Sequence, residues 1–571
     1  MPVHGGADPG AGDQDRPCLA GHVPPFEQHR LRPHPAGQPG PVHQGRTQVD
    51  HGDGGRPLLP RLLRRQRHRR LCRRALFVAA DDDLLAAPRR QRRLRPRCLR
   101  AVQVAGCKPH GAFARSGHGV SEVPAAGTFF GHPRGLAYLA FTELWERFSY
   151  YGMTALLALY MGQQLLLPGH AENVLGLAAL RDLMEFRGPM SNQAFASLIY
   201  GWYGGLVYLT PILGGLVADR WLGAKRTVVI GALLMSAGHL AMSFDASFLI
   251  ALALLILGSG FLKGNISAQV GALYPAEAES LRERGFTIFS TGINVGSVIG
   301  PLATGGVAAI YGWHAGFALA AGLMIVALAV YLAGQRHLPG ARPVRRKDDG
   351  LPPLTAAERK RTTALILFIA LSILPMLAYS MIWNIGIVWV NEQVSLGSPL
   401  GTVPATWFNA VDALASIVAA APLVALWAWQ ARRGTEPDSV AKIAIGCAIT
   451  GASALFFVLG HLLAGEAGKV SVIWALGGYF GMGVGFMYYW PITLAVVSKS
   501  APAKINSTMM GVAFLALFIG SVSMGWVGSF YQEMSHIAFW TLDAAIGLAG
   551  ALIAWLLRRP LEHQLGLQPA G

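Results

Sequence analysis

The chain has 571 residues, of which 52% are hydrophobic and only 14% are charged, and its formal net charge is +17 at pH 7. Soluble domains carry about 25% charged residues, so the composition excludes an ordinary soluble protein and indicates a chain that crosses a membrane many times. The charge does not indicate a nucleic-acid partner, because residues 1–120 hold 22 Lys and Arg residues against 9 Asp and Glu, and thus most of the excess.

Residues 1–120 show none of the patterns of a folded domain. Pro, Gly, His and Arg dominate this segment, and its apolar residues follow neither a helical nor an alternating period. Three interpretations are open: a basic tail that binds anionic lipid or nucleic acid, a disordered tail without a role, and an out-of-frame translation of GC-rich DNA joined by a start codon assigned too early. We favour the third, with an authentic start near Val120 or Val123.

The rest of the chain contains twelve stretches long enough to cross a bilayer, which takes about 20 mainly apolar residues per helix. A polar, basic segment at 335–362 separates the first six from the last six. The sequence therefore predicts an all-α membrane protein with twelve transmembrane helices in two six-helix bundles, 121–334 and 363–557, joined by the linker 335–362 and followed by the tail 558–571. The expected spans are 137–166, 194–218, 226–244, 247–270, 286–310, 314–334, 363–391, 405–429, 440–463, 470–497, 507–529 and 537–557.

Basic residues gather after every second predicted span. Arg220, Lys225 and Arg226 follow the second span and eight Lys and Arg residues follow the sixth, whereas the connections after the odd-numbered spans carry few. Basic loops stay in the cytoplasm during membrane insertion. We therefore expect both termini, the linker and the tail to be cytoplasmic, and the loop 168–193 to lie outside.

The first predicted span carries charges inside an apolar stretch. Glu143, Glu146 and Arg147 stand at positions i, i+3 and i+4, so they share one face of one helix. A charge inside a membrane costs several kcal/mol unless it is paired or faces a watery cavity. This face is predicted to line a polar pathway, and the alternative is a salt bridge that only stabilises packing.

The connection between the second and third spans contains Asp219, Arg220, Gly223 and Arg226. Its pattern matches the signature loop of major facilitator transporters. An acid at a helix end beside basic residues can hold neighbouring helices in one state and release them in another. We expect this loop to act on conformation and not on substrate.

Three separated motifs resemble those of the proton-dependent oligopeptide transporters, a family of the major facilitator superfamily. They are the segment from Glu143 to Gly152 in the first span, the segment around Lys263 in the fourth, and the segment 284–301 in the fifth. The resemblance implies the major facilitator fold in a bacterial cytoplasmic membrane. It also implies transport driven by a proton gradient, with no enzymatic reaction, cofactor or metal.

The residue types of these motifs suit a zwitterionic peptide, whose charged termini must be neutralised before they enter an apolar space. Arg147 and Lys263 offer donors for a carboxylate, while Glu143 and Glu146 can carry a proton. Lys263 has a structural alternative, as a partner of Glu143 or Glu146, and each tyrosine has one in packing. The expected substrate-binding residues are Arg147, Tyr150, Tyr151, Tyr203, Tyr208, Lys263, Asn294 and Trp383; the expected proton-coupling residues are Glu143, Glu146, Arg147, Lys263 and Asp412.

The carboxy-terminal half departs from the family pattern. Members usually have a glutamate four residues after a tryptophan in the seventh span, whereas Trp383 is followed at that spacing by Ile387. Phe486 stands where a second glutamate, early in the tenth span, is usual. A buried ammonium needs a compensating charge, so this loss weakens the inference to ordinary peptides. Other acids can substitute, namely Asp412 in the eighth span, Glu392 near the outer end of the seventh and Asp543 near the start of the twelfth.

The expected activity is therefore uptake of di- or tripeptides, or peptide-like solutes, together with protons, by a monomer that alternates its access. One alternative is a major facilitator transporter of another solute, such as one without a free amine, or an exporter. A second is a sensor that binds substrate without moving it. A membrane enzyme is disfavoured, since the chain shows neither a metal-ligand spacing nor a phosphate-binding glycine loop.

Overall fold

The computed structural model describes residues 128–129, 131–186, 188–275, 278–339, 353–399, 401–465 and 468–566. The segment 1–120, for which three interpretations were open, lies outside these residues. The described part is almost wholly helical. Its strands form only two short antiparallel hairpins, β1 (Thr128–Phe129) with β2 (His132–Pro133), and β3 (Gly397–Ser398) with β4 (Gly401–Thr402).

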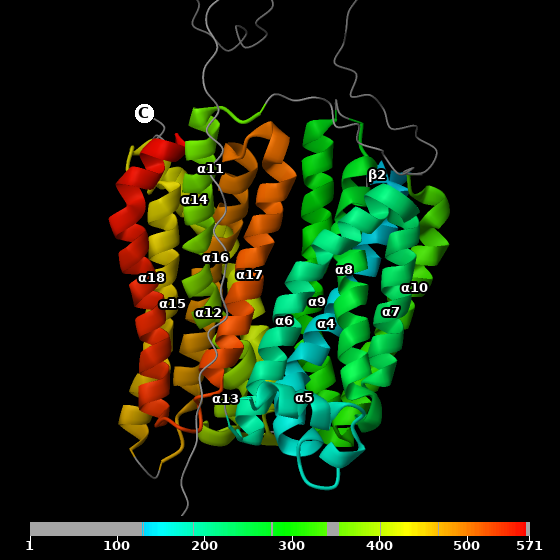
Figure 1. The fold of residues 1–571 in the computed structure, drawn as a ribbon, viewed down its shortest axis with the longest axis vertical. Helices are drawn as coiled ribbons and strands as arrows, with labels where there is room; N and C mark the ends of the chain where they lie inside the picture. Colours follow the sequence, from blue (N-terminus) through cyan, green and yellow to red (C-terminus); the bar gives the residue numbers. More distant parts are fainter. Residues whose placement is uncertain are drawn as a thin grey trace, which may run out of the picture. The chain divides into compact units, whose positions relative to one another are not determined.

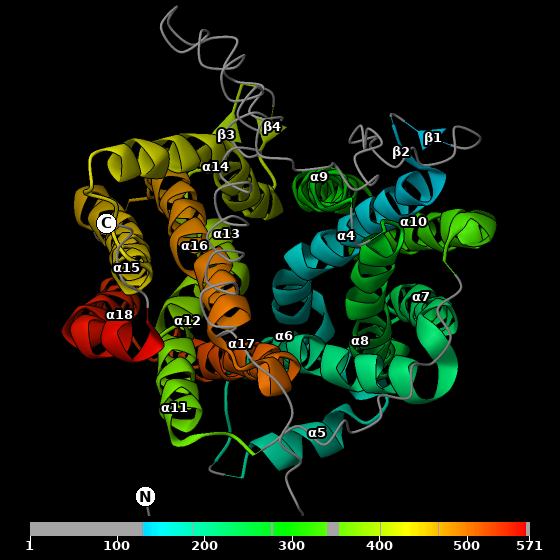
Figure 2. The ribbon, with the colours of Figure 1, turned by 90° about the horizontal axis from the view of Figure 1, so that it is seen from above.

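The helices form two bundles that lie side by side (Figures 1 and 2). A short helix, α5 (Leu177–Met184), lies in the loop after the first span, and the end of both bundles on that side is called the α5 end below. The amino-terminal bundle contains α4 (Arg134–Tyr160), α6 (Asn192–Val217), α7 (Gly223–Ala241), α8 (Phe248–Ala272), α9 (Glu279–Tyr311) and α10 (Trp313–Gly334). The carboxy-terminal bundle contains α11 (Ala356–Ala370), α12 (Ile373–Met381), α13 (Ile387–Gln393), α14 (Phe408–Arg432), α15 (Ser439–Ala464), α16 (Val472–Ser500), α17 (Asn506–Gly528) and α18 (His536–Leu565).

Ten stretches of the described residues are long and apolar enough to cross a membrane. One of them, Asn192–Ala241, contains two helices, α6 and α7, joined by a π-helical turn at Ala218–Leu222. The helix α4 is not among the ten, because charged and polar side chains interrupt its apolar sequence. With both corrections the described residues hold twelve spans, six in each bundle, as predicted.

Two helices extend into the segments predicted to be linker and tail, and both extensions have a local cause. The helix α11 begins within the stretch expected to be linker, because Thr355 and Glu358 form a capping box that starts the helix there. The helix α18 continues to Leu565, into the expected tail, where Arg558 pairs with Asp438 and Glu562.

Glycines let α9 approach α4 closely. A Cβ atom on Gly296 would lie 2.5 Å from the carbonyl oxygen of Leu144, and one on Gly300 would lie 2.5 Å from that of Phe148. Small residues at such intervals allow two membrane helices to pack backbone against backbone. This packing fixes the position of α4, which carries the charged face predicted from the sequence.

The two bundles are joined by hydrogen bonds near the α5 end. Asn384, in the π-helical turn Ile382–Gly386 that interrupts the seventh span, donates to Ser197 Oγ of α6 at 2.7 Å. Ser197 Oγ donates in turn to the carbonyl oxygen of Gly525 on α17 at 2.9 Å. Trp407, just before α14, donates from Nε1 to the carbonyl oxygen of Leu302 on α9 at 3.0 Å. The bundles therefore close against each other at this end.

Candidate functional site

The charged face of α4 is buried inside the protein. Arg147 is held by the two glutamates of its own helix, since its Nε lies 2.8 Å from Glu143 Oε1 and 2.8 Å from Glu146 Oε2. The exposed fractions of these side chains are only 9% for Arg147, 3% for Glu143 and 0% for Glu146. The helical spacing of the sequence thus brings the three groups together as predicted. The terminal amino groups of Arg147 hydrogen-bond to no described residue.

Lys263 approaches this cluster from α8. Its Nζ lies 4.1 Å from the centre of the Tyr150 ring and 5.8 Å from that of Tyr208. A cation over an aromatic face is stabilised by roughly 0.5–2 kcal/mol. Among the described residues Lys263 forms no ion pair, with Glu143 and Glu146 or with any other acid. In this conformation it is therefore not the structural partner of either glutamate.

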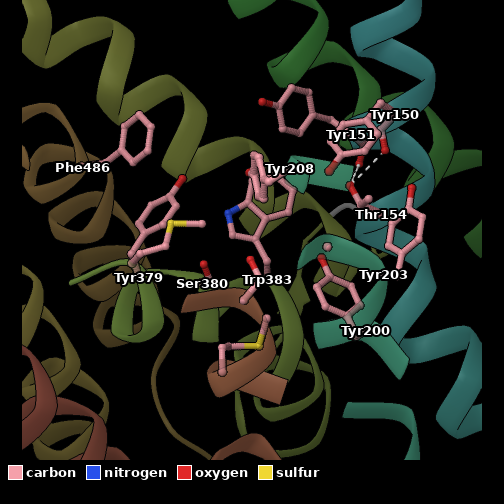
Figure 3. Close-up of a pocket in the computed structure, with 14 residues that line it drawn as sticks. Tyr150, Tyr151, Thr154, Tyr200, Tyr203, Tyr208, Tyr379, Ser380, Trp383 and Phe486 are labelled. Atoms are coloured by element: carbon pink, nitrogen blue, oxygen red, sulfur yellow. Dashed lines mark hydrogen bonds between the residues drawn. The ribbon is translucent and has the colours of Figure 1, made fainter. Parts of the chain in front are cut away.

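A cavity lies between the bundles beside these charges (Figure 3). Tyrosines of α4 and α6 form one wall, and residues of α12, α16 and α17 form the other. The figure shows Tyr150, Tyr151 and Tyr203 on one side, and Tyr379 and Phe486 on the opposite side. The lining residues are Tyr150, Tyr151, Thr154, Tyr200, Tyr203, Gly204, Tyr208, Met376, Tyr379, Ser380, Trp383, Phe486, Ser521 and Met524.

The two walls meet at one aromatic contact. The rings of Tyr151 on α4 and Trp383 in the seventh span lie 5.6 Å apart, and those of Tyr150 and Tyr151 lie 5.2 Å apart. The hydroxyl of Tyr203 is buried and has no hydrogen-bond partner among the described residues. Such a wall offers ring faces and one unsatisfied hydroxyl, which suits a ligand with both apolar side chains and polar backbone groups.

Behind the carboxy-terminal wall lies Asp412 of α14, which is 1% exposed. Its Oδ2 accepts hydrogen bonds from Tyr379 Oη at 2.7 Å and from Trp383 Nε1 at 3.2 Å. Both donors line the cavity, so Asp412 is one side chain away from it. Tyr379 was missed in the sequence, although it precedes Trp383 by four residues and so shares its helix face.

The positions of the two missing glutamates are apolar in different ways. Ile387 is fully buried in α13 and reaches no polar group of the cavity. Phe486 lines the cavity, and its ring lies 5.0 Å from that of Tyr379. The position of the seventh-span glutamate, Ile387, is thus packed in the interior and does not line the cavity. The position of the tenth-span glutamate, Phe486, lines the cavity but carries no charge.

Asn294 and the four residues of the predicted conformational loop lie away from the cavity, whereas Arg147, Lys263 and the two glutamates of α4 lie beside it without lining it. Asn294, expected to bind substrate, has an exposed side chain on α9 and is not among the lining residues. The predicted conformational loop lies at the turn between α6 and α7, where Asp219, Arg220 and Arg226 are exposed. They form no ion pair with a described residue. Gly223 has a φ of 73°, a value that favours glycine, and so fixes the turn.

The site as a whole has a charge at each wall. Arg147 and Lys263 lie next to the amino-terminal wall without lining the cavity, since the Lys263 Nζ is 4.1 Å from the ring centre of the lining residue Tyr150. The carboxyl group of Asp412 lies behind the carboxy-terminal wall. This arrangement can neutralise a ligand with separated charges and can hold protons on buried acids.

A family model described as the POT family matches residues 225–347 and 354–542. The chain belongs to the POT family. Among curated relatives, it is 31% identical over 512 residues to the di-/tripeptide transporter of Lactococcus lactis subsp. cremoris, covering 77% of this chain and 98% of that protein. It is 27% identical to the peptide transporter YePEPT of Yersinia enterocolitica, covering 79% and 99%.

Solved structures of the POT family agree with this fold. A crystal structure of the peptide transporter POT in complex with sulfate superposes with a TM-score of 0.69 at 27% identity, over 78% of this chain and 98% of that one. A mutant of the peptide transporter POT in complex with alafosfalin gives a TM-score of 0.67 at 27% identity, over 76% and 96%. The predicted family, the major facilitator fold and the nature of the chain as a multi-pass membrane transporter are therefore confirmed.

Proposed function

We propose that this protein takes up di- and tripeptides, or peptide-like solutes, by proton-coupled symport with alternating access. The relatives named as di-/tripeptide and peptide transporters support the substrate class. The observation that carries the proposal is the arrangement of the cations. Arg147 is anchored through Nε by two glutamates, while its terminal amino groups and Lys263 have no carboxylate partner among the described residues.

Cationic donors without a hydrogen-bond partner beside a membrane-embedded cavity suit an anionic ligand, because a buried donor without a partner is costly. A peptide carboxylate can accept from the planar fork of Arg147 and from Lys263 at once. The tyrosine rings of the same wall then contact the peptide's side chains.

The proton is proposed to travel on Glu146 and Glu143. Neither oxygen of Glu146 has a hydrogen-bond partner in the described part of the chain, although Oε2 lies 2.8 Å from Arg147 Nε, so this side chain can exist with or without a proton. When substrate draws Arg147 towards its carboxylate, the glutamates lose part of their counter-charge and bind a proton more strongly. Loading of both ligands then permits the bundles to rock.

The membrane orientation follows from the distribution of basic residues. Arg220, Lys225 and Arg226 lie at the end opposite α5, so we propose that this end faces the cytoplasm, together with both termini. The α5 end would then face the outside of a bacterial cytoplasmic membrane. Since the bundles are joined at the α5 end, the conformation described here would face inward.

Uptake into proteoliposomes tests the proposal. Labelled dialanine should accumulate when an inward proton gradient is imposed, and only equilibrate without one. Glu146→Gln and Lys263→Ala should abolish accumulation, whereas Glu172→Gln, a matched control in the loop next to α5, should keep it. Unchanged accumulation by Glu146→Gln would contradict the proposed route of the proton through Glu146. The absence of any dialanine transport by the folded wild type would contradict peptides as the substrate class.

A further inference from the structure

Among the described residues, the carboxyl group of Asp412 accepts hydrogen bonds from two lining residues of the carboxy-terminal wall. The surroundings of this group are unusual. Both hydrogen bonds to Asp412, from Tyr379 and Trp383, converge on Oδ2, while Oδ1 is buried and has no partner among the residues that the structure describes. A carboxylic acid with its proton on Oδ1 fits this geometry, since Oδ2 then acts as the carbonyl acceptor. An ionised carboxylate would leave a charged, unsatisfied oxygen in the membrane interior.

No cation compensates Asp412 in the described part of the chain. The titratable groups that interact with it are the phenols of Tyr151 on α4, Tyr379 on α12, and Tyr479 and Tyr489 on α16. Among the described residues, no lysine, arginine or histidine forms an ion pair with it. Only a proton, or a cation brought in from outside, can therefore neutralise this acid.

The charges beside the amino-terminal wall indicate which cation from outside can neutralise Asp412. Arg147 and Lys263 carry free donors next to the amino-terminal wall, against the lining residue Tyr150, so a peptide whose carboxylate reaches them points its other end across the cavity. That end carries an ammonium group, and the side it meets is formed by Tyr379 and Trp383, directly in front of Asp412. The charges of the walls thus match those of a zwitterion in one orientation.

We propose that Asp412 binds the substrate's ammonium group by exchanging its own proton for it. This inference rests on the proposed peptide uptake and adds the residue that selects for a free amine. One proton leaves Oδ1 for the cavity water, one ammonium takes over the charge, and Tyr379 or Trp383 gives up its bond to Oδ2. The family's two glutamates are replaced by Ile387 and Phe486, but the site still requires an amine on the substrate. The reason is that Asp412, on a third helix, supplies the negative charge.

A pair of ligands tests this exchange on the wild type. Dialanine and propionyl-alanine differ only in that the second has hydrogen in place of the amine. In weakly buffered detergent at pH 6, binding of dialanine should release about one proton more per site than binding of propionyl-alanine. Equal proton release by the two ligands would overturn the exchange.

Two matched variants then locate the effect. In the wild type, dialanine should compete with labelled dialanine at least about tenfold better than propionyl-alanine, because a buried charge pair is lost without the amine. Asp412→Asn should remove this preference and the extra proton. Asp543→Asn, which changes a buried acid of α18 outside the cavity, should keep both.

The outcomes separate the two proposals. A wild type that transports dialanine, together with an Asp412→Asn variant that still prefers the free amine, would overturn the role of Asp412 and leave peptide uptake intact. A folded wild type that neither binds nor moves dialanine would overturn the proposed function itself. If Asp412→Asn did not fold, the proton release of the wild type would still decide the exchange.

Discussion

Buried charge is neutralised in different ways beside the two walls of the cavity. On the amino-terminal side, the helix α4 supplies both the cation and its counter-charges, so the pairing of Glu143, Glu146 and Arg147 needs no other helix. On the carboxy-terminal wall, Asp412 depends on donors from a second helix and has no cation. Glu143, Glu146 and Arg147 neutralise one another when the site is empty, whereas Asp412 is neutral in an empty site only as a protonated acid.

The largest effect is expected from breaking the self-contained wall. Arg147→Ala leaves two carboxylates buried next to each other, and losing one member of a buried ionic cluster costs about 3–5 kcal/mol of unfolding free energy. The thermal unfolding temperature in detergent should fall sharply, and uptake should be lost. Arg134→Ala, at the exposed start of the same helix, is the control. Equal unfolding temperatures for the two variants would show that the cluster does not stabilise the fold.

A second test moves the same wall without changing its charges. In Gly296→Val, the new Cβ would lie 2.5 Å from the Leu144 carbonyl oxygen and 2.8 Å from Arg147 Cβ, so α4 must shift away from α9. Such overpacking costs about 1–3 kcal/mol and should reduce dialanine uptake as well as stability. Gly322→Val, on α10 with no atom within 4 Å of the new Cβ, should change neither measurement. Full uptake by Gly296→Val would mean that the packing of α4 is more tolerant than its contacts indicate.

The contrast between the walls can also be reduced by adding an acid. Phe486→Glu places a carboxylate beside Tyr379, and in an Asp412→Asn background it should restore about tenfold preference for dialanine over propionyl-alanine. Phe486→Gln in the same background keeps the size and polarity of the new side chain but not its charge, and should restore nothing. Equal behaviour of the two would show that the position cannot reach the amine.

The smallest effect is expected at the contact between the bundles. Ser197→Ala removes the acceptor for Asn384 and the donor to Gly525, which should weaken closure of the α5 end by about 1 kcal/mol. The population closed at this end should fall about fivefold relative to the open one. Distances between spin labels on the α5-end loops of the two bundles would report the shift. Ser236→Ala, whose hydrogen bond stays within α7, is the control and should leave the distances unchanged.

The spans and the α4 cluster could be predicted from the sequence because both depend on local order. Hydropathy over a window reports a span, and residues at i, i+3 and i+4 share a helix face whatever the rest of the chain does. The position of Lys263 over Tyr150 could not be predicted in this way. It depends on how α8 packs against α4, so the alternative of a pair with Glu143 or Glu146 was equally compatible with the sequence.

The carboxy-terminal wall shows the same limit more clearly. Asp412 was noticed because an acid in an apolar span is unusual, but its partners lie in another helix, 33 and 29 residues earlier in the chain. No periodicity links these positions. The absence of acids at Ile387 and Phe486 was visible in the sequence, whereas the sealing of the first and the lining role of the second required the packing.

The glycines at the contact of α6 with α17 bear on how the bundles can move. A Cβ on Gly201 would lie 2.6 Å from the Cα of Gly525, and one on Gly525 would lie 2.8 Å from the Cα of Gly201, so two bare backbones touch there. Side chains that interlock would have to separate before the two helices could move relative to each other. Two backbones that meet at glycines can move without such a separation. When the α5 end opens, no side chains of these two glycines have to disengage, whereas a methyl group on either glycine would prevent the close contact in the closed state.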